Sequence, residues 1–376
     1  MVYDCIVLGV GGIGSAALYA AAKKGWSVLG IDRFGAVHDR GSSHGRTRII
    51  RTAYFEHPNY VPLARSAWSS WELLQGLGST KLMQKTGLLQ VGPESGEVIQ
   101  GVLSSAREHE IAIEQMSTQD AMQRFPAFKL PNEQCAVFEE QAGFLLVENC
   151  IAQVLKLAQQ ESATLMSNTV AERISVDDDG TINVITSDET FRARRLVIAL
   201  GSWTRELLSG LEFGIEVVRK PMFWFQIDRT DIKYQNGLPA FLIETDENCF
   251  YSIPEVDYLG MKVAEHSGGQ PVADPLEVDR NCNADEQSAC EAFLDQHFEF
   301  SKRRLVHHSV CMYSMSADGH FIVDSHPDCS NIVFAAGMSG HGFKFAPVIG
   351  ERLVEMLDSQ ANEDFDFLRM GNRQLV

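Results

Sequence analysis

The sequence predicts a fold of mixed α/β and α+β class, in which a doubly wound nucleotide-binding domain is interrupted by a mixed-sheet domain and completed by the C-terminal segment. Three observations predict this arrangement. Residues 2–32 have the pattern of a strand, a glycine-rich turn, a helix, a second strand and an acid. Residues 331–357 show another strand, glycine-rich loop and helix. Residues 216–304 between them consist mainly of strand-like runs and charged loops, which indicate a separate sheet.

The glycine-rich turn Gly9–Gly14 reads GVGGIG. The strand before it is expected over Val2–Leu8, the helix after it over Ser15–Lys24, and the next strand over Ser27–Ile31. Gly25 follows the helix at a position where a left-handed cap is favourable. The whole is therefore expected to form a βαβ unit.

Each glycine of this turn has a physical role in binding a dinucleotide. Gly9 permits the tight turn, Gly11 lets the backbone approach a pyrophosphate, and Gly14 lets the helix pack against the strand. The helix N-terminus offers free N–H groups to phosphate, and Asp32 can accept a hydrogen bond from a ribose hydroxyl. The pattern predicts a dinucleotide site, and the alternative is a glycine-rich loop in a core βαβ unit without a ligand.

The remaining elements follow from periodicity and turn signals. Gly41–Arg51 is expected to be a polar loop, and Pro58 to begin a helix whose apolar side carries Tyr60, Leu63, Trp68, Trp71 and Leu74. Further helices are expected over Glu97–His109, Glu148–Gln160 and Ala346–Leu357. Strands are expected over Lys85–Val91, Val170–Val176, Thr181–Thr186, Arg195–Gly201, Lys220–Ile227, Ala240–Glu244, Cys249–Ile253, Tyr258–Ala264 and Asn331–Gly337. Asp177–Gly180 is interpreted as a hairpin turn and not as a metal site, so no metal is expected.

Composition limits the function. The 376 residues are too many for one ordinary core, so two domains are expected. A net charge of −18 argues against nucleic acid or an anionic membrane as a partner. There is no apolar span of membrane length and no signal-peptide pattern at Met1, so a cytoplasmic protein is expected. The eight cysteines contain no CxxC pair and are expected to be reduced and mostly buried.

The motif alone does not decide which dinucleotide binds. A single glycine-rich motif of this kind predicts one bound dinucleotide, and an NAD-dependent enzyme would also carry such a motif. The second cluster, Gly337, Gly340 and Gly342, instead indicates backbone packed against a large flat group, because helix N–H groups there could stabilise an anionic reduced flavin. We therefore favour a flavin.

Four segments together are typical of one known family. They are the opening βαβ unit, Gly41-Ser-Ser-His-Gly-Arg-Thr-Arg-Ile-Ile-Arg51, Val310-Cys-Met-Tyr313 with Asp318-Gly-His-Phe321, and Ser339-Gly-His-Gly-Phe-Lys-Phe345. In these segments the chain resembles the monomeric sarcosine oxidase family, which includes N-methyltryptophan oxidase and pipecolate oxidase. The resemblance runs over nearly the whole chain. It implies a Rossmann-like, glutathione-reductase-type FAD domain (1–82, 143–215 and 305–376) interleaved with a mixed-sheet substrate and catalytic domain (83–142 and 216–304).

The resemblance also implies an activity. Members of the family oxidise secondary amino acids with O2, giving an imine and hydrogen peroxide. A sarcosine-like N-methyl amino acid is the first choice of substrate, and N-methyltryptophan or pipecolate is the alternative. A flavin amine dehydrogenase that does not use O2, and a flavoprotein that only binds a metabolite, remain open. The protein is expected to act as a monomer.

Site residues are carried over from the same resemblance. Cys311 is implied to be bonded through sulfur to FAD, Arg51 and Lys344 to bind the substrate carboxylate, and Lys262 to activate oxygen. The expected catalytic residues are Lys262, Arg48, His44, His266 and Tyr251, and the last also faces substrate. The expected cofactor-binding residues are Gly9, Gly11, Gly12, Ile13, Gly14, Asp32, Arg33, Ser42, Ser43, Thr47, Gly201, Trp203, Cys311, Met312, Gly337, Gly340, His341, Gly342 and Lys344.

Two positions depart from the family pattern Gly-Ser-His-His-Gly-Asp-Thr-Arg. Ser43 stands where the family has a histidine, and Arg46 stands where it has an acid. Because the second change reverses a charge, the electrostatics around His44 and Arg48 are expected to be rearranged.

Overall fold

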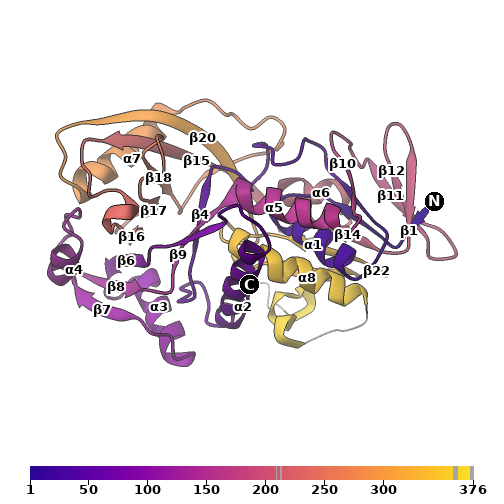
Figure 1. Cartoon of the computed structure of the whole chain (residues 1–376), viewed down its shortest axis with the longest axis horizontal. Helices are drawn as coiled ribbons and strands as arrows, with labels where there is room; N and C mark the ends of the chain where they lie inside the picture. Colours follow the sequence, from indigo (N-terminus) through magenta and orange to yellow (C-terminus); the bar gives the residue numbers. More distant parts are fainter. Residues whose placement is uncertain (209, 212–213, 359–362, 373–376) are drawn as a thin grey trace.

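The structure is a computed structural model that describes residues 1–208, 210–211, 214–358 and 363–372. The molecule is elongated, with a large sheet towards each end and helix α2 between them (Figure 1). The eight α-helices of the described residues are α1 (Gly12–Lys23), α2 (Tyr60–Gly76), α3 (Glu97–Glu108), α4 (Thr118–Arg124), α5 (Val147–Gln160), α6 (Thr204–Leu207), α7 (Ala284–His297) and α8 (Ala346–Leu357).

A six-stranded sheet holds the glycine-rich turn. Its strand order is β10-β3-β2-β14-β22-β21, in which β21 alone runs antiparallel to its neighbour. The strands are β2 (Cys5–Leu8), β3 (Val28–Ile31), β10 (Thr164–Met166), β14 (Leu196–Ile198), β21 (Ile322–His326) and β22 (Cys329–Ala336). Every residue of β2, β3 and β14 is buried, as expected for strands covered on both faces of the sheet.

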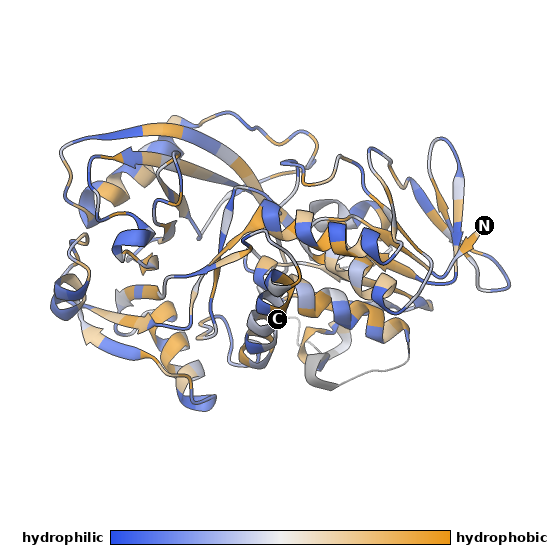
Figure 2. Cartoon of the chain, viewed as in Figure 1, coloured by the Kyte–Doolittle hydropathy of each residue, from blue (hydrophilic) through white to orange (hydrophobic). Residues whose placement is uncertain are grey.

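Helix α1 lies on this sheet and packs against both α5 and α8. The crossing with α8 is close, because a Cβ atom at Gly350 would lie 2.5 Å from the backbone nitrogen of Ala17. Apolar and polar residues alternate around α5 and α8 in Figure 2, as expected for helices with one buried side. The predicted bounds of α8 are confirmed, and α1 begins three residues earlier than predicted, inside the glycine-rich turn.

A four-stranded sheet caps the N-terminal end of the molecule, in the order β1-β13-β12-β11. Its strands are β1 (Val2–Tyr3), β11 (Arg173–Val176), β12 (Ile182–Ile185) and β13 (Thr190–Ala193). The predicted hairpin turn at 177–180 is confirmed. The single strand predicted over Val2–Leu8 is wrong: Asp4 divides it, since its carboxylate accepts hydrogen bonds from Ser27 and β1 joins a different sheet.

A nine-stranded mixed sheet lies at the opposite end of the molecule (Figure 1). Its order is β19-β15-β18-β17-β16-β6-β8-β7, with β20 on β15. The strands are β6 (Leu88–Pro93), β7 (Glu114–Ser117), β8 (Gln134–Glu139), β15 (Glu216–Ile227), β16 (Ala240–Glu244), β17 (Cys249–Ile253), β18 (Met261–Glu265), β19 (Gln270–Pro271) and β20 (Arg303–Met315). Strand β20 pairs with β15 along its whole length, so Cys311 lies on this sheet.

A three-stranded sheet, β4-β9-β5, joins the two halves. It consists of β4 (Thr47–Ile50), β9 (Gly143–Leu146) and β5 (Met83–Lys85). The prediction of a loop over Gly41–Arg51 is therefore wrong at its C-terminal end, where Arg48 lies in a strand paired with Leu145. Over 216–304 the structure has the expected strands and, in addition, the helix α7, which was not predicted.

All eight cysteines are free. Four are buried, three are half-buried and Cys282 is exposed, so the expectation of mostly buried thiols holds only in part. No helix among the described residues has both the length and the apolar character needed to cross a bilayer.

Candidate active site

The larger of two adjoining cavities opens at the carboxyl ends of β2, β3, β14 and β22. This edge is where a doubly wound sheet binds ligands. The cavity holds about 1460 Å³, including its open mouth. Of the cofactor residues expected from the sequence, it is lined by Gly9, Gly11, Gly12, Ile13, Asp32, Arg33, Ser42, Ser43, Gly201, Trp203, Met312, Gly337, Gly340 and Gly342. Its lining runs from the glycine-rich turn past Asp32 to the glycine loop at Gly337–Gly342, which suits an extended dinucleotide.

The glycine-rich turn leaves the N-terminus of α1 open to this cavity. Gly9 has φ +80°, and a Cβ atom there would lie 2.5 Å from the carbonyl oxygen of Ala199. A Cβ atom at Gly14 would lie 1.7 Å from the carbonyl oxygen of Gly9. Gly11, which precedes α1, makes no side-chain cap, and the N–H group of Gly12 donates to Ser43, so the N–H groups of Ile13 and Gly14 are the ones that a phosphate could use. The turn therefore fits a pyrophosphate.

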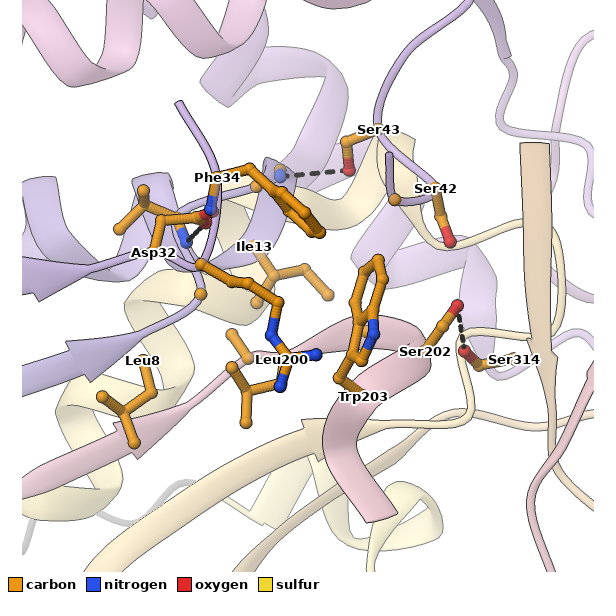
Figure 3. A pocket seen from close by; sticks show the side chains of 18 of the residues that line it. Leu8, Ile13, Asp32, Phe34, Ser42, Ser43, Leu200, Ser202, Trp203 and Ser314 are labelled. Carbon is orange, nitrogen blue, oxygen red and sulfur yellow. Dashed lines mark hydrogen bonds between the residues drawn. The ribbon is translucent and has the colours of Figure 1, made fainter. Parts of the chain in front are cut away.

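Asp32 and the rings of Phe34 and Trp203 lie along the wall of the larger cavity (Figure 3). Asp32 accepts hydrogen bonds from the N–H groups of Val10 (2.8 Å) and Phe34 (2.9 Å). These bonds fix the carboxylate at the cavity wall, and its remaining lone pairs are available to hydroxyl groups. The Phe34 and Trp203 rings lie 5.5 Å apart between centroids. The residues thus fit the ribose and base of the predicted dinucleotide.

Ser43 replaces the family's histidine without leaving the cavity wall. Its hydroxyl accepts a 3.2 Å hydrogen bond from the N–H group of Gly12, at the first turn of α1 (Figure 3). The Ser43 hydroxyl therefore lies beside the first turn of α1, where the pyrophosphate of a dinucleotide would bind.

The smaller cavity adjoins the larger one and holds about 510 Å³, including its mouth. Arg48, Tyr313, Gly340 and Phe343 line both cavities. The rest of its wall is formed by Ile49, Arg51, Phe55, Glu56, Leu242, Tyr251, His266, His341 and Lys344. Apolar and aromatic side chains surround a small group of charges, which is the usual composition of a small-molecule site.

Arg51 is paired with Glu56, an acid that was not among the expected site residues. Its Nη2 lies 2.7 Å from Oε1 and 2.6 Å from Oε2 of Glu56, and its guanidinium lies 4.1 Å from the ring centre of Tyr54. The charges of Arg51, His341 and Lys344 lower the pKa of Glu56 to about 2, against the opposing effect of burial. Glu56 therefore carries a negative charge beside the Arg51 guanidinium.

Lys344 is the second cation of the smaller cavity. Its Nζ donates to the carbonyl oxygen of His341 (2.8 Å) and to the hydroxyl of Tyr54 (3.3 Å). Burial, with the nearby charge of Arg51, lowers the pKa of Lys344 to about 7. His341 shapes this loop, because its ring nitrogens lie 2.5 Å from the Tyr54 hydroxyl and 3.1 Å from the carbonyl oxygen of Gly319.

Lys262 lies behind the cavity wall on β18. Its Nζ donates to the carbonyl oxygens of Gly45 and Thr47, each at 2.9 Å, and lies 5.4 Å from the ring of Trp224. Burial and the charge of Arg48 lower its pKa well below the ordinary value.

Arg48 and Cys311 are in contact. Arg48 donates to Cys311 Sγ at 3.3 Å and to the carbonyl oxygen of Ser42 at 3.0 Å. Cys311 Sγ is itself 3.5 Å from that oxygen. Because Ser42 and Arg48 line the larger cavity, the thiol lies directly behind its wall.

The two departures from the family pattern affect the site differently. Arg46 forms an ion pair with Asp257 at the surface and so directs its charge away from the cavity. His44 is buried, with Nδ1 3.4 Å from the Ser309 hydroxyl, and burial with the charge of Arg48 lowers its pKa to about 3. His44 is therefore neutral and Arg46 adds no charge to the cavity wall.

The expected residues thus fall into three groups. Most cofactor residues line the larger cavity, while Arg51, Tyr251, His266, His341 and Lys344 line the smaller one. Gly14, His44, Thr47, Lys262 and Cys311 line neither, and lie buried behind the walls. Glu56, Phe55, Leu242 and Phe343 were not selected from the sequence, although Phe343 lies inside the motif Ser339–Phe345.

Comparison with known proteins identifies the family. The model of the DAO family, described as FAD dependent oxidoreductase, matches residues 4–356. Monomeric sarcosine oxidase of Bacillus sp. strain B-0618 is 34% identical over 361 residues, covering 94% of this chain and 92% of that protein. N-methyl-L-tryptophan oxidase of Yersinia pestis strain Pestoides F is 34% identical over 352 residues, covering 93% and 94%.

Solved structures show the same fold. NikD, an amino acid oxidase essential for nikkomycin biosynthesis, superposes in its Tyr258Phe mutant form with a TM-score of 0.86 at 20% identity, covering 98% of this chain and 96% of that one. Glycine oxidase from Geobacillus kaustophilus superposes with a TM-score of 0.84 at 16% identity, covering 99% of each chain. The chain therefore belongs to the DAO family of FAD dependent oxidoreductases.

Proposed function

We propose that this enzyme is an oxidase of small N-methyl amino acids, of the sarcosine type, that produces an imine and hydrogen peroxide. One observation carries the proposal: a cavity lined by the cations Arg51 and Lys344 meets the dinucleotide cavity through four shared wall residues, among them a third cation, Arg48. A guanidinium and an ammonium together suit a small carboxylate. The relatives named as sarcosine and N-methyl-L-tryptophan oxidases support the substrate class.

The substrate carboxylate has to compete with Glu56 for Arg51. Because Glu56 already occupies Arg51 Nη2 with both oxygens, entry of a second carboxylate requires that Glu56 give up at least one contact. Lys344, which contacts only neutral oxygens in its printed hydrogen bonds, is the cation that an entering carboxylate meets without this competition.

The amine end of the substrate would face Arg48, Tyr251 and Tyr313, which are cationic or neutral. Burial raises the pKa of Tyr251 to about 12 and holds the pKa of His266 at about 4, so neither changes charge near neutral pH. This environment favours the uncharged amine and lowers the amine pKa. No general base is then required for the oxidation.

Bound FAD supplies the acceptor for two electrons from the C–H bond next to nitrogen. Overall the amine loses two electrons and two protons, and O2 takes them up as hydrogen peroxide. The imine then hydrolyses to an aldehyde and an amine. We assign oxygen activation to Lys262, whose Nζ is fixed by two carbonyl oxygens and would stabilise negative charge on oxygen.

Cys311 is the proposed attachment residue for FAD. Its thiol lies behind the wall of the larger cavity, where Arg48 donates to its sulfur at 3.3 Å. Denaturing the purified yellow protein in acid should leave flavin on the polypeptide, and Cys311→Ala should release it. Cys290→Ala, which alters another buried thiol remote from the cavities, is the matched control. Release of flavin from the unaltered protein would contradict covalent attachment.

We also propose that the chain acts as a monomer. The proposed domain limits are those expected from the sequence, except that β20 belongs to the substrate sheet.

The direct test of the proposed function is a comparison of substrates. Sarcosine, N-methyltryptophan and pipecolate are compared for loss of the oxidised flavin absorption and for peroxide. Bleaching without peroxide would indicate a dehydrogenase, and no bleaching by any secondary amine would indicate a protein that only binds a metabolite.

A further inference from the structure

A buried acid outside both cavities contacts the segment that carries Arg51 and Glu56. Glu139, the last residue of β8, is fully buried. Its Oε1 accepts hydrogen bonds from the backbone N–H of Thr52 (2.7 Å) and from the Thr52 hydroxyl, and its Oε2 accepts one from the N–H of Ala53 (3.1 Å). Three donors therefore meet on one carboxylate.

This arrangement suits the ionised carboxylate, which accepts at both of its oxygens. Burial raises the pKa of Glu139, while the bonds from Thr52 and Ala53 and the charge of Arg51 oppose the rise. The Glu139 carboxyl group is thus held by the same turn that follows Arg51 in the chain.

The turn Thr52–Ala53 connects Glu139 to the Arg51 guanidinium. The carbonyl oxygen of Ala53 accepts a 3.1 Å hydrogen bond from Arg51 Nη1. Ala53 therefore contacts Glu139 through its N–H group and Arg51 through its carbonyl group. A rotation of this turn would change both contacts together.

Helix α3 contacts the next two residues of the chain, Tyr54 and Phe55. The hydroxyl of Ser105 on α3 donates to the carbonyl oxygen of Tyr54. A Cβ atom at Gly101 would lie 2.2 Å from the carbonyl oxygen of Phe55, so α3 packs directly on this backbone. Residues 52–55 are thus held by β8 and α3, both outside the six-stranded sheet, while Arg51 follows β4 in the three-stranded sheet.

We propose that Glu139 is a positioning residue for Arg51, which fixes the Thr52–Ala53 turn so that the guanidinium is directed into the smaller cavity. Glu139 does not line that cavity and acts only through the turn. The inference rests on the proposed function, because it takes Arg51 to bind the carboxylate of the substrate. It gives the nine-stranded sheet a part in carboxylate recognition.

The test uses the FAD-loaded full-length protein and its Glu139→Gln variant. Acetate is titrated against each, and binding is followed by the change in flavin absorption. A glutamine side chain cannot accept from three donors and brings an N–H group of its own, so the turn should rotate. We expect the Kd for acetate to rise about tenfold.

Kinetics separate this role from a general loss of structure. The kcat/KM for sarcosine should fall by the same factor as acetate binding. The kcat/KM for N-methylpropylamine, which has no carboxylate, should stay unchanged. Asp228→Asn is the matched control, because Asp228 accepts from the N–H groups of Ser301 and Lys302 and from the Ser301 hydroxyl at the surface, far from the cavities.

The outcomes are distinct. If the unaltered protein does not bind acetate, the proposed function fails and the inference fails with it. If the unaltered protein binds acetate and Glu139→Gln binds it equally well, only the inference is overturned. If Glu139→Gln does not fold, Thr52→Val removes the hydroxyl donor alone and should weaken acetate binding about threefold, and unchanged binding overturns the inference.

Discussion

Glu56 occupies the guanidinium of Arg51 with both carboxylate oxygens, at 2.6 and 2.7 Å, inside the cavity where the substrate carboxylate is expected. The protein therefore contains its own competitor for that cation. Because the pair is almost completely buried, its two charges are screened by little solvent.

Replacing this competitor should strengthen carboxylate binding. Glu56→Gln removes the negative charge and keeps the side-chain shape, so we expect the Kd for acetate and the KM for sarcosine to fall about fivefold. Asp231→Asn, which alters an acid paired with Arg229 at the surface, is the control and should change neither value. Weaker binding in Glu56→Gln would mean that Glu56 supports the cation site instead of competing for it.

Carboxylate affinity should depend on the protonation of Lys344. Its pKa is lowered to about 7 by burial, so the cation is present below that pH and is lost as the pH rises through it. The Kd for acetate should therefore increase from about pH 6 to about pH 9, a range in which acetate itself stays ionised. In Lys344→Gln the affinity should be weaker and independent of pH. A flat profile in the unaltered protein would assign the binding to Arg51 alone.

Gly14 should be essential for loading the cofactor. An alanine there would place Cβ 1.7 Å from the carbonyl oxygen of Gly9, so the turn and the start of α1 must move apart. We expect Gly14→Ala to purify without flavin absorption. Gly76→Ala, at the end of α2 where no atom lies within 4 Å of the added carbon, should retain it. A fully yellow Gly14→Ala protein would contradict the pyrophosphate site.

Lys262 should affect the rate at which O2 reoxidises the reduced flavin, and not the rate at which the amine reduces it. Lys262→Met removes the group held by Gly45 and Thr47, so reoxidation of reduced flavin by O2 should slow at least about a hundredfold. Anaerobic reduction by sarcosine should change by less than about threefold, since Lys262 lines neither cavity. Stopped-flow measurement of the two half-reactions separates these effects. Lys233→Met, at a surface ion pair with Glu255, is the control.

The sequence predicts the elements whose patterns are local. In the turn Gly9–Gly14, a side chain at Gly9 or Gly14 would collide with backbone atoms, as the sequence motif predicts. Helix α8 has the predicted bounds. Helix α7 was missed although Cys290, Phe293, Leu294 and His297 are its buried stripe, with Asn283 as the N-cap. The helical spacing of these four residues would have predicted α7, but the residues between them are mostly polar, which favours a loop.

Other features could not be read from local pattern. The strand β4 has only four residues and directly follows a segment rich in glycine, serine and charged residues, so in the sequence it resembles the end of a loop. Glu56 and Glu139 are acids among many, and their roles come from contacts with Arg51 and with the Thr52–Ala53 turn, which are made only in the folded chain. The family resemblance indicated Arg51 and Lys344 as site residues, but it did not indicate Glu56, the acid that pairs with Arg51.

The central strand β14 lies between β2, which is made first, and β22, which is made near the end of synthesis. A ribosome adds about 5–20 residues per second, so the glycine-rich turn emerges long before the glycine loop that completes the same cavity. Until β22 arrives, one side of β14 is an unpaired apolar edge that can pair with other chains. Flavin loading is therefore a step that follows translation, and chains truncated before Cys329 should aggregate instead of accumulating as soluble apoprotein.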